Sequence, residues 1–575
     1  MIRTFTQHVV RECILLDGHW DFVVDADNRG VQDEWFKHFP GQKRKMYVPG
    51  CWNNEIGLYD YEGVAWYRTT ITLRASGHTK LLFHAVSGQA DIYIDGVHVG
   101  AHYGGFTAFE VIIPELEAGA HSLVVRTDNT HNEQSLPLAH VDWYHYGGIL
   151  RPVELQVLPD LYIDKLNIKY ALTGNDAEVD ISLRLRRLGG TGSNIPIMIS
   201  LNDEIVHTAE EVWPVEQEYL KVHVRQDWRN LRLWELEDPA LYTVRVVAGE
   251  DDYTDRIGFR TVEVKSKQIL LNGKPLYIQG VNRHEEHPEW GFAFPPKLMD
   301  KDLDIIEELG CNSIRGSHYP QSAYWLDLLD ERGIVFWSEI PLWQYHVPHM
   351  TDPLVRERAM HMLEEMVSYN FHHPSVLFWS VHNECDTNTA EGLEFTKLLT
   401  DRVRALDDSR LVTYATHQAL DDRTLALFDV IGINKYYGWY DGDVEEFTRF
   451  MKEYHAYAES VGAGHIPVIL AEFGGAGIYG DTGWEERRLF SEEYQADILT
   501  KALKIFREDP NIVGTYIWQF ADIRSDARTF RDRARSFNNK GLVNEYRKPK
   551  LAYREVRRIY RQGQDGTPEI KRYTE

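Results

Sequence analysis

The stretch VLFWSVHNE, residues 376–384, is an apolar run that ends in an amide and an acid. A short, continuous apolar run of this kind predicts a strand that is buried on both faces. It is followed by EFTKLLTDRVRAL, residues 394–406, whose apolar residues have helical spacing. The two segments together predict one strand–helix unit of the kind that builds a parallel sheet.

The same unit recurs along the second half of the chain. LYIQGVNRHE (276–285) predicts a first strand, followed by a helix over about 295–310 with one apolar face. Further strands are expected in SIRGSHY, IVFWSEI, LVTYATH, VIGINKY, IPVILAEFG and IVGTYIWQF. Most of these strands precede a clear helical pattern, and the helix after the fifth strand has the weakest signal. Eight such units predict a (β/α)8 TIM barrel over residues 264–575.

Polar side chains gather where the predicted strands end. Active sites of such barrels lie at the carboxyl ends of the strands, so these side chains are expected at one rim. Stability alone does not require them to be collected there. They are Asn282 to Glu285, His318, Tyr319, Glu339, Asn383, Glu384, His417, Asn434, Tyr436, Tyr437, Glu472 and Trp518.

Two carboxylates of this rim, at the ends of strands four and seven, predict glycoside cleavage. Such cleavage needs one acid for the leaving oxygen and a second carboxyl group at the oxocarbenium-like centre, about 5–5.5 Å away in retaining enzymes. We assign Glu472 as the nucleophile and Glu384 as the acid/base. Tyr436 is expected to keep Glu472 ionised, and Asn383 to bind the sugar 2-hydroxyl.

The first half of the chain predicts two β-sandwiches. DIYIDGVHVG, residues 91–100, alternates around an Asp-Gly turn and is typical of a hairpin. Residues 1–158 are therefore expected to form a jelly-roll-like sandwich. Short strands separated by turn clusters predict an immunoglobulin-like sandwich over residues 159–263.

Composition limits the partners of the protein. The chain of 575 residues has a formal net charge of -26, which opposes binding to nucleic acid or to an anionic membrane. Its four cysteines lack the spacing of a zinc site, and neither a metal nor another cofactor is expected. The N-terminus lacks the pattern of a signal peptide, and no apolar run is long enough to span a bilayer, so a cytoplasmic location is expected.

Several motifs, in this order along the chain, resemble glycoside hydrolase family 2. They are SHYP, WSVHNE, NKYYGWY and AEFGG, and they accompany the three-domain order described above. The resemblance covers essentially the whole chain. It implies a sugar-binding-like jelly roll, an immunoglobulin-like domain and a catalytic barrel, with Glu384 as acid/base and Glu472 as nucleophile. It also implies that Asp142 reaches the site from the first domain, that His284 lines it, and that the protein forms a dimer or tetramer.

Within that family, the motifs are most similar to those of the β-glucuronidases. NKYYGWYDG (434–442) resembles a tyrosine-rich motif that implies Tyr436 and Tyr440 near the nucleophile and sugar. SFNNKGLVNEYRKPK (536–550) contains an Asn-x-Lys-Gly element, which implies that Asn538 and Lys540 hold a C6 carboxylate. Trp518 is expected to contact the same substrate. The expected reaction is retaining hydrolysis of terminal β-D-glucuronides.

Some residues depart from the β-glucuronidase pattern and leave alternatives open. His382 stands where a small residue is usual, the arginine-rich segment 524–535 is unusually long, and GVNRHEEHP also resembles β-galactosidases. A β-galacturonidase or a β-galactosidase therefore stays open. A non-catalytic carbohydrate-binding protein is a further alternative, which the presence of both glutamates opposes.

Overall fold

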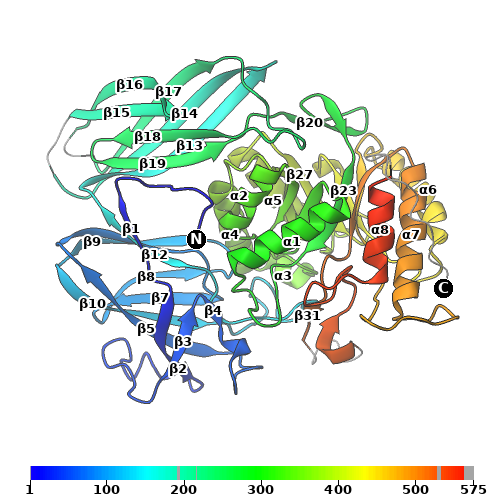
Figure 1. Ribbon diagram of the computed structural model, residues 1–575, viewed down its shortest axis with the longest axis horizontal. Coiled ribbons are helices and arrows are strands. Elements are labelled where there is room, and N and C mark those ends of the chain that lie inside the picture. The colour runs from blue at the N-terminus through cyan, green and yellow to red at the C-terminus, as the bar shows by residue number, and fades with distance from the viewer. Residues whose placement is uncertain (1, 191–193, 215–216, 527–532, 563–575) are drawn as a thin grey trace.

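A computed structural model describes residues 2–190, 194–214, 217–526 and 533–562 of the chain. Figure 1 shows two β-rich regions on one side and a barrel of strands and helices on the other. The candidate site lies at the polar ends of the barrel strands. Segments of the first region and of the chain after the last barrel strand also reach it.

The first region is built from two antiparallel sheets with a common apolar core. One sheet has the order β1-β12-β6-β9 and the other β3-β2-β5-β10-β7-β8, with β4 paired to β11 beside them. Large aromatic side chains such as Trp20, Phe22 and Trp52 are buried in this core. The strands are β1 (Glu12–Leu15), β2 (Gly18–Asp25), β3 (Arg44–Val48), β4 (Gly50–Cys51), β5 (Val64–Leu73), β6 (Gly77–Phe83), β7 (Gln89–Ile94), β8 (Val97–Tyr103), β9 (Phe109–Leu116), β10 (Gly119–Asp128), β11 (Gly148–Ile149) and β12 (Val153–Leu158).

The second region is also a sandwich of antiparallel sheets, ordered β13-β14-β17 and β16-β15-β18-β19. Buried and exposed residues alternate along β14, which leaves one face for the core around Trp213. The strands are β13 (Leu161–Thr173), β14 (Asp176–Arg187), β15 (Asn194–Leu201), β16 (Glu204–Val212), β17 (Tyr219–Trp228), β18 (Tyr242–Ala248) and β19 (Asp251–Ile257). A small sheet of β20 (Val262–Lys265), β21 (Gln268–Leu271) and β22 (Lys274–Leu276) then leads into the barrel.

The third region is a closed parallel barrel in sequence order, which confirms the predicted fold class. Apart from the partly exposed Gln279, every residue of its strands is buried, as the continuous apolar runs predict. They are β23 (Ile278–Arg283), β24 (Ser313–Gly316), β25 (Val335–Glu339), β26 (Val376–Asn383), β27 (Leu411–Thr416), β28 (Ile431–Asn434), β29 (Val468–Phe473) and β30 (Ile512–Ile517). Gly432 on β28 faces the wide ring of Trp337, and a Cβ added there would lie 2.8 Å from that ring.

Helices cover the outside of the barrel, and Figure 1 shows α7 and α8 side by side near the C-terminus of the chain. They are α1 (Pro296–Leu309), α2 (Ala323–Arg332), α3 (Val347–Thr351), α4 (Pro353–Tyr369), α5 (Ala390–Leu406), α6 (Glu446–Ser460), α7 (Glu492–Glu508) and α8 (Leu551–Tyr560). The β27–β28 connection, where the helical signal is weakest, holds the 3-10 turn η2 (Leu425–Leu427). There Asp422 accepts hydrogen bonds from the backbone and hydroxyl of Thr424, local bonds that favour a turn over a helix.

No helix in the described ranges has both the length and the hydropathy that crossing a membrane requires.

Candidate active site

Both predicted catalytic carboxylates lie at the carboxyl end of the barrel. Glu472 belongs to β29, and Glu384 directly follows β26. The backbone of Glu384 has φ +55°, a left-handed conformation that is uncommon for residues other than glycine and often marks functional sites. The conformation changes the direction of the chain immediately after the strand.

Arg315 of β24 links the residues around these carboxylates. Its Nη1 donates to Glu472 Oε1 at 2.7 Å, and its Nη2 donates to Asn383 Oδ1 at 2.8 Å. The same Nη2 lies 2.9 Å from Glu339 Oε1. Burial raises the pKa of Glu339, but the Arg315 charge and hydrogen bonds outweigh it and hold that pKa at about 2. A buried cation between two acids thus forms the centre of the rim.

Glu472 is the deeper of the two candidate catalytic groups. Its side chain is 6% exposed, and its Oε2 accepts a hydrogen bond from the Tyr436 hydroxyl at 2.7 Å. Burial raises the pKa of Glu472, while Arg315, His318 and the Tyr436 hydroxyl act in the opposite direction. Burial and the Glu472 charge also raise the pKa of Tyr436 well above its usual value, so this phenol stays a donor.

Glu384 has a different environment, in which neutral amides donate to both carboxylate oxygens and His417 Nδ1 lies 3.9 Å from Oε2. Its Oε1 accepts from Asn434 Nδ2 at 2.8 Å, and its Oε2 accepts from Gln344 Nε2 at 2.9 Å. Its side chain is 12% exposed, twice the value of Glu472. A cation binds one carboxylate while amides bind the other, a division of environments that is typical of two carboxyl groups with different tasks.

Hydrogen bonds link Glu384 to Glu472 through the side chains of Asn434, Asn383 and Arg315. Asn434 Nδ2 also donates to Asn383 Oδ1 at 3.0 Å, and Asn434 is the β-ladder neighbour of Glu472. The Nδ2 atom of Asn383 is buried and has no hydrogen-bond partner among the described residues. It is therefore a donor whose partner a ligand hydroxyl can supply.

A lysine lies close to this network, among aromatic rings. Lys540 Nζ donates to the Tyr440 hydroxyl at 2.8 Å and lies 4.8 Å from the centre of that ring. It also lies 5.8 Å from the ring of Tyr436, whose hydroxyl binds Glu472. Lys540 is 4% exposed, so its charge acts in a region of low dielectric.

Asn538 and Asp142 come together although they are 396 positions apart in the chain. Asn538 Nδ2 donates to Asp142 Oδ2 at 3.0 Å, and Asn538 Oδ1 accepts from the Lys540 backbone N–H at 3.3 Å. Asp142 also pairs with Arg533, at 2.6 Å between Oδ1 and Nη2. Arg533 belongs to the arginine-rich segment, of which residues 527–532 lie outside the described residues.

Four aromatic side chains form another wall beside Glu472. Trp518 stacks on His318, with ring centres 5.1 Å apart, and packs edge-on against His284 at 5.5 Å. Trp143, next to Asp142, lies 5.6 Å from the ring of His284. Burial lowers the pKa of His284 well below its usual value, so the ring is neutral. Its Nε2 has no hydrogen-bond partner in the described part of the chain.

The structure therefore brings all ten candidate residues into one contact network. The network also contains Arg315, Gln344, Trp143 and Arg533, which are not among the candidates predicted from the sequence. For Arg315 a signal exists, because a charged residue inside a buried strand needs an ion partner. For Gln344 no such signal exists, since it lies in a loop.

His382, the departure within strand four, lies on the other face of that strand. Its Nε2 is 2.9 Å from the hydroxyl of Thr396 on α5. Burial lowers the pKa of His382 to about 4, so its ring is neutral at physiological pH. This residue packs the strand against the helix.

Comparisons with known proteins match this architecture. Residues 262–564 match the model of the TIM barrel domain of glycosyl hydrolases family 2, and residues 161–260 match a second model of that family. A β-glucuronidase of Paenibacillus borealis is 28% identical over 594 residues, covering 96% of this chain and 97% of the relative. A longer relative from Formosa agariphila is 28% identical, covering 85% of this chain and 63% of the relative.

A solved structure is also similar. The crystal structure of a family 2 β-galacturonidase from Eisenbergiella tayi, bound to galacturonate, has a TM-score of 0.89 and 31% sequence identity. The match covers 98% of this chain and 99% of that chain.

Proposed function

The chain belongs to glycosyl hydrolases family 2 and is a glycoside hydrolase, and on that premise we propose that it hydrolyses terminal β-D-glucuronides with retention of configuration. One observation carries the proposal: the buried ammonium of Lys540 lies beside Tyr440 and Tyr436, and Tyr436 binds Glu472. A cation beside the tyrosine that binds the nucleophile suits a sugar that carries its own carboxylate.

The proposed first step is attack by Glu472 on the anomeric carbon. A Glu472 oxygen forms a bond to that carbon while the bond from the carbon to the leaving oxygen breaks, and Glu384 gives its proton to the leaving oxygen. Arg315 supports this assignment, because its direct contact with Glu472 Oε1 favours the ionised form that a nucleophile needs. Tyr436 adds a second donor to the same carboxylate.

The proposed second step reverses the roles of acid and base. Glu384, now ionised, takes a proton from a water molecule, and the water oxygen displaces Glu472 from the anomeric carbon. The greater exposure of Glu384 supports its role, since its proton must exchange with leaving group and water. Asn383 Nδ2 would donate to the sugar 2-hydroxyl, a contact that strengthens in the transition state.

The sugar carboxylate is expected at Lys540 and Asn538. The ammonium supplies the charge, and the amide a directed hydrogen bond. Asp142 would accept from a sugar hydroxyl, and Trp518 and His284 would contact the ring of the sugar.

A β-galacturonide is the second candidate substrate. The similar solved structure from Eisenbergiella tayi is that of a β-galacturonidase. The two uronides differ in the orientation of the C4 hydroxyl, and both carry the carboxylate that Lys540 would bind. The ion pair between Asp142 and Arg533 supplies both an acceptor and a donor at this side of the site.

The test of the proposed function is a hydrolysis panel of p-nitrophenyl β-glucuronide, β-galacturonide and β-galactoside. We expect the glucuronide to give the highest kcat/KM. Lys540→Ala should lower kcat/KM on uronides about 100-fold or more, as expected for loss of a charge-assisted contact, and spare any activity on the neutral galactoside. Lys548→Ala, an exposed lysine of the same segment, is the matched control. Equal losses on charged and neutral substrates would contradict the proposal.

The roles of the two glutamates need a separate test. With a dinitrophenyl glycoside, whose leaving group needs no proton, Glu384→Gln should still form the glycosyl-enzyme, and mass spectrometry should detect the added sugar. Glu472→Gln should form none. An adduct in Glu472→Gln would reverse the assignment.

A further inference from the structure

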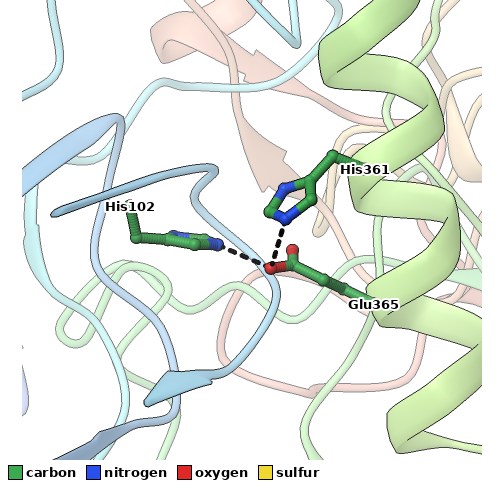
Figure 2. Close-up of side chains that lie close together, drawn as sticks. All are labelled: His102, His361 and Glu365. Atoms are coloured by element: carbon green, nitrogen blue, oxygen red, sulfur yellow. Dashed lines mark hydrogen bonds and ion pairs between the residues drawn. The ribbon is translucent and has the colours of Figure 1, made fainter. Parts of the chain in front are cut away.

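Two histidines and a glutamate meet where the first region packs against the barrel. His102 lies on β8, while His361 and Glu365 lie one turn apart on α4. Figure 2 shows both rings directed at the same carboxylate oxygen, one from each side of the contact. His102 Nε2 is 2.9 Å from Glu365 Oε1, and His361 Nε2 is 3.6 Å from it. The three ligand atoms all lie within 4.8 Å of one another.

We propose that His102, His361 and Glu365 bind one zinc ion, which joins β8 of the first region to α4 of the barrel. Imidazole nitrogens and a carboxylate oxygen are ligands that zinc prefers, at about 2.0–2.2 Å. A tetrahedral site with such bonds separates its ligand atoms by about 3.3 Å. The two measured separations, 2.9 and 3.6 Å, lie on either side of that value. For these two pairs, adjustments of a few tenths of an ångström suffice, and the third pair of ligand atoms lies within 4.8 Å.

The surroundings hold two of the three ligands in place. The Thr107 hydroxyl donates to the other oxygen of Glu365 at 2.6 Å, leaving Oε1 for the ion. The ring of His102 stacks on Phe109, with centres 4.3 Å apart. Neighbouring residues that contact metal ligands without binding the metal orient those ligands in proteins. His361 is 58% exposed and can rotate to complete the set.

Ordinary hydrogen bonding accounts for only one of the two histidines, since His102 Nε2 lies within hydrogen-bond distance of Glu365 Oε1. The 3.6 Å separation between His361 and Glu365 is too long for a hydrogen bond, yet both rings face one oxygen. Within the described ranges, the ion pairs of Glu365 are with these two histidines. Two other clusters of acids and histidine have arginine partners instead, since Arg11 binds Asp251 and Arg3 binds Asp327.

A fourth ligand can come from solvent. His361, Glu365 and Thr107 line a cavity of about 870 Å³ between the first two regions and the barrel. Water in this cavity can fill the remaining position of a tetrahedral ion. The ion would then fix the packing of β8 on α4. Tyr103, next to His102, accepts from the backbone N–H of Leu136 at 2.9 Å, in the segment that leads to Asp142.

The test uses the untagged full-length protein, stripped with a chelator and titrated with zinc chloride by calorimetry. We expect one zinc ion per chain, a higher unfolding midpoint with zinc, and the visible spectrum of tetrahedral cobalt when Co²⁺ replaces it. Thr107→Val should weaken binding about 10–100-fold, the usual effect of losing an outer partner. His361→Ala should weaken it further, because it removes a ligand.

His98→Ala is the matched control, since His98 is a half-exposed histidine on the same strand and lies outside the cluster. It should bind zinc as the unaltered protein does. Because His361 is exposed, its replacement leaves the fold intact, and a normal circular dichroism spectrum will check this. The proposal is overturned if the unaltered protein binds no stoichiometric zinc, or if His361→Ala binds it equally well.

Discussion

At the scale of single residues, Arg315 organises the site. Its guanidinium is fully buried and contacts Glu472 through Nη1, and Glu339 and Asn383 through Nη2. A planar fork of donors suits several carboxylate and amide oxygens at once, which a lysine ammonium would not match. Glu339 places a second negative charge beside the cation. Burial raises the pKa of Glu472, and the charge of Arg315 acts against that rise.

The hydrogen bond from Tyr436 to Glu472 leads to a prediction about pH. Tyr436→Phe removes a donor that favours the ionised carboxylate, so the pKa of Glu472 should rise. The nucleophile must be ionised, and the acidic limb of the kcat/KM profile should therefore move to higher pH, with kcat/KM about 10–100-fold lower. Initial rates measured across pH check this shift.

Tyr437→Phe is the control for that experiment. The ring of Tyr437 packs on Phe447 and Phe450, away from Glu472. Its profile should match that of the unaltered enzyme. An acidic limb that stays in place in Tyr436→Phe would show that this hydroxyl does not set the charge of Glu472.

The sequence predicted these residues unevenly, for a physical reason. Glu384 and Glu472 follow apolar runs, so their position at a strand end was readable. Arg315 was not selected because its partners lie on strands three, four and seven, and only closure of the barrel brings them together. The same holds for the three residues of the proposed zinc site, since His102 lies more than 250 residues before His361 and Glu365.

At the scale of elements, continuous apolar runs predicted the barrel strands because these strands are buried on both faces. Helices were predictable where an apolar face repeats, as in α1. The apolar pattern of the β27–β28 connection did not show whether the segment forms a helix or a turn. Its aspartate and threonine side chains bond to the local backbone, and such bonds compete with a helix in ways that apolar spacing does not report.

Strand β28 leads to a prediction about packing inside the barrel. A Cβ at Gly432 would collide with the backbone carbonyl oxygen of Tyr414, and it would lie 2.8 Å from the ring of Trp337 and 3.1 Å from the Cβ of Ala471. Gly432→Ala should therefore destabilise the protein by about 1–3 kcal/mol, the usual cost of overpacking. Urea unfolding followed by tryptophan fluorescence measures the change.

Gly41→Ala is the control, since a Cβ there meets no atom within 4 Å. We expect its unfolding midpoint to stay unchanged or to rise slightly, because alanine restricts the unfolded chain. If Gly432→Ala were as stable as this control, the barrel interior would have room that the structure does not provide.

At the scale of the whole molecule, distant regions complete one site. Asp142 comes from the first region, Asn538 and Lys540 follow the last barrel strand, and the glutamates belong to the barrel. The packing of the first region against the barrel therefore determines where Asp142 lies. This dependence connects the proposed zinc site to the active site through the same contact.

The charge of the whole chain leads to the last prediction. The formal net charge of -26 repels an anionic glucuronide at long range, while Lys540 attracts it only at contact. The screening length falls from about 30 Å at 0.01 M salt to about 8 Å at 0.15 M, and buried charges are screened much less than exposed ones. Added salt should therefore weaken the repulsion more than the attraction.

We expect kcat/KM for p-nitrophenyl β-glucuronide to rise about twofold or more between 0.01 and 0.15 M salt, because repulsion slows the approach of the substrate. Sodium chloride and potassium chloride should act alike, since the effect depends on ionic strength. A neutral glycoside, where it is hydrolysed, should show no such rise. A decrease for the glucuronide would mean that cations at the site, such as Lys540 and Arg533, dominate the field that the substrate meets during its approach.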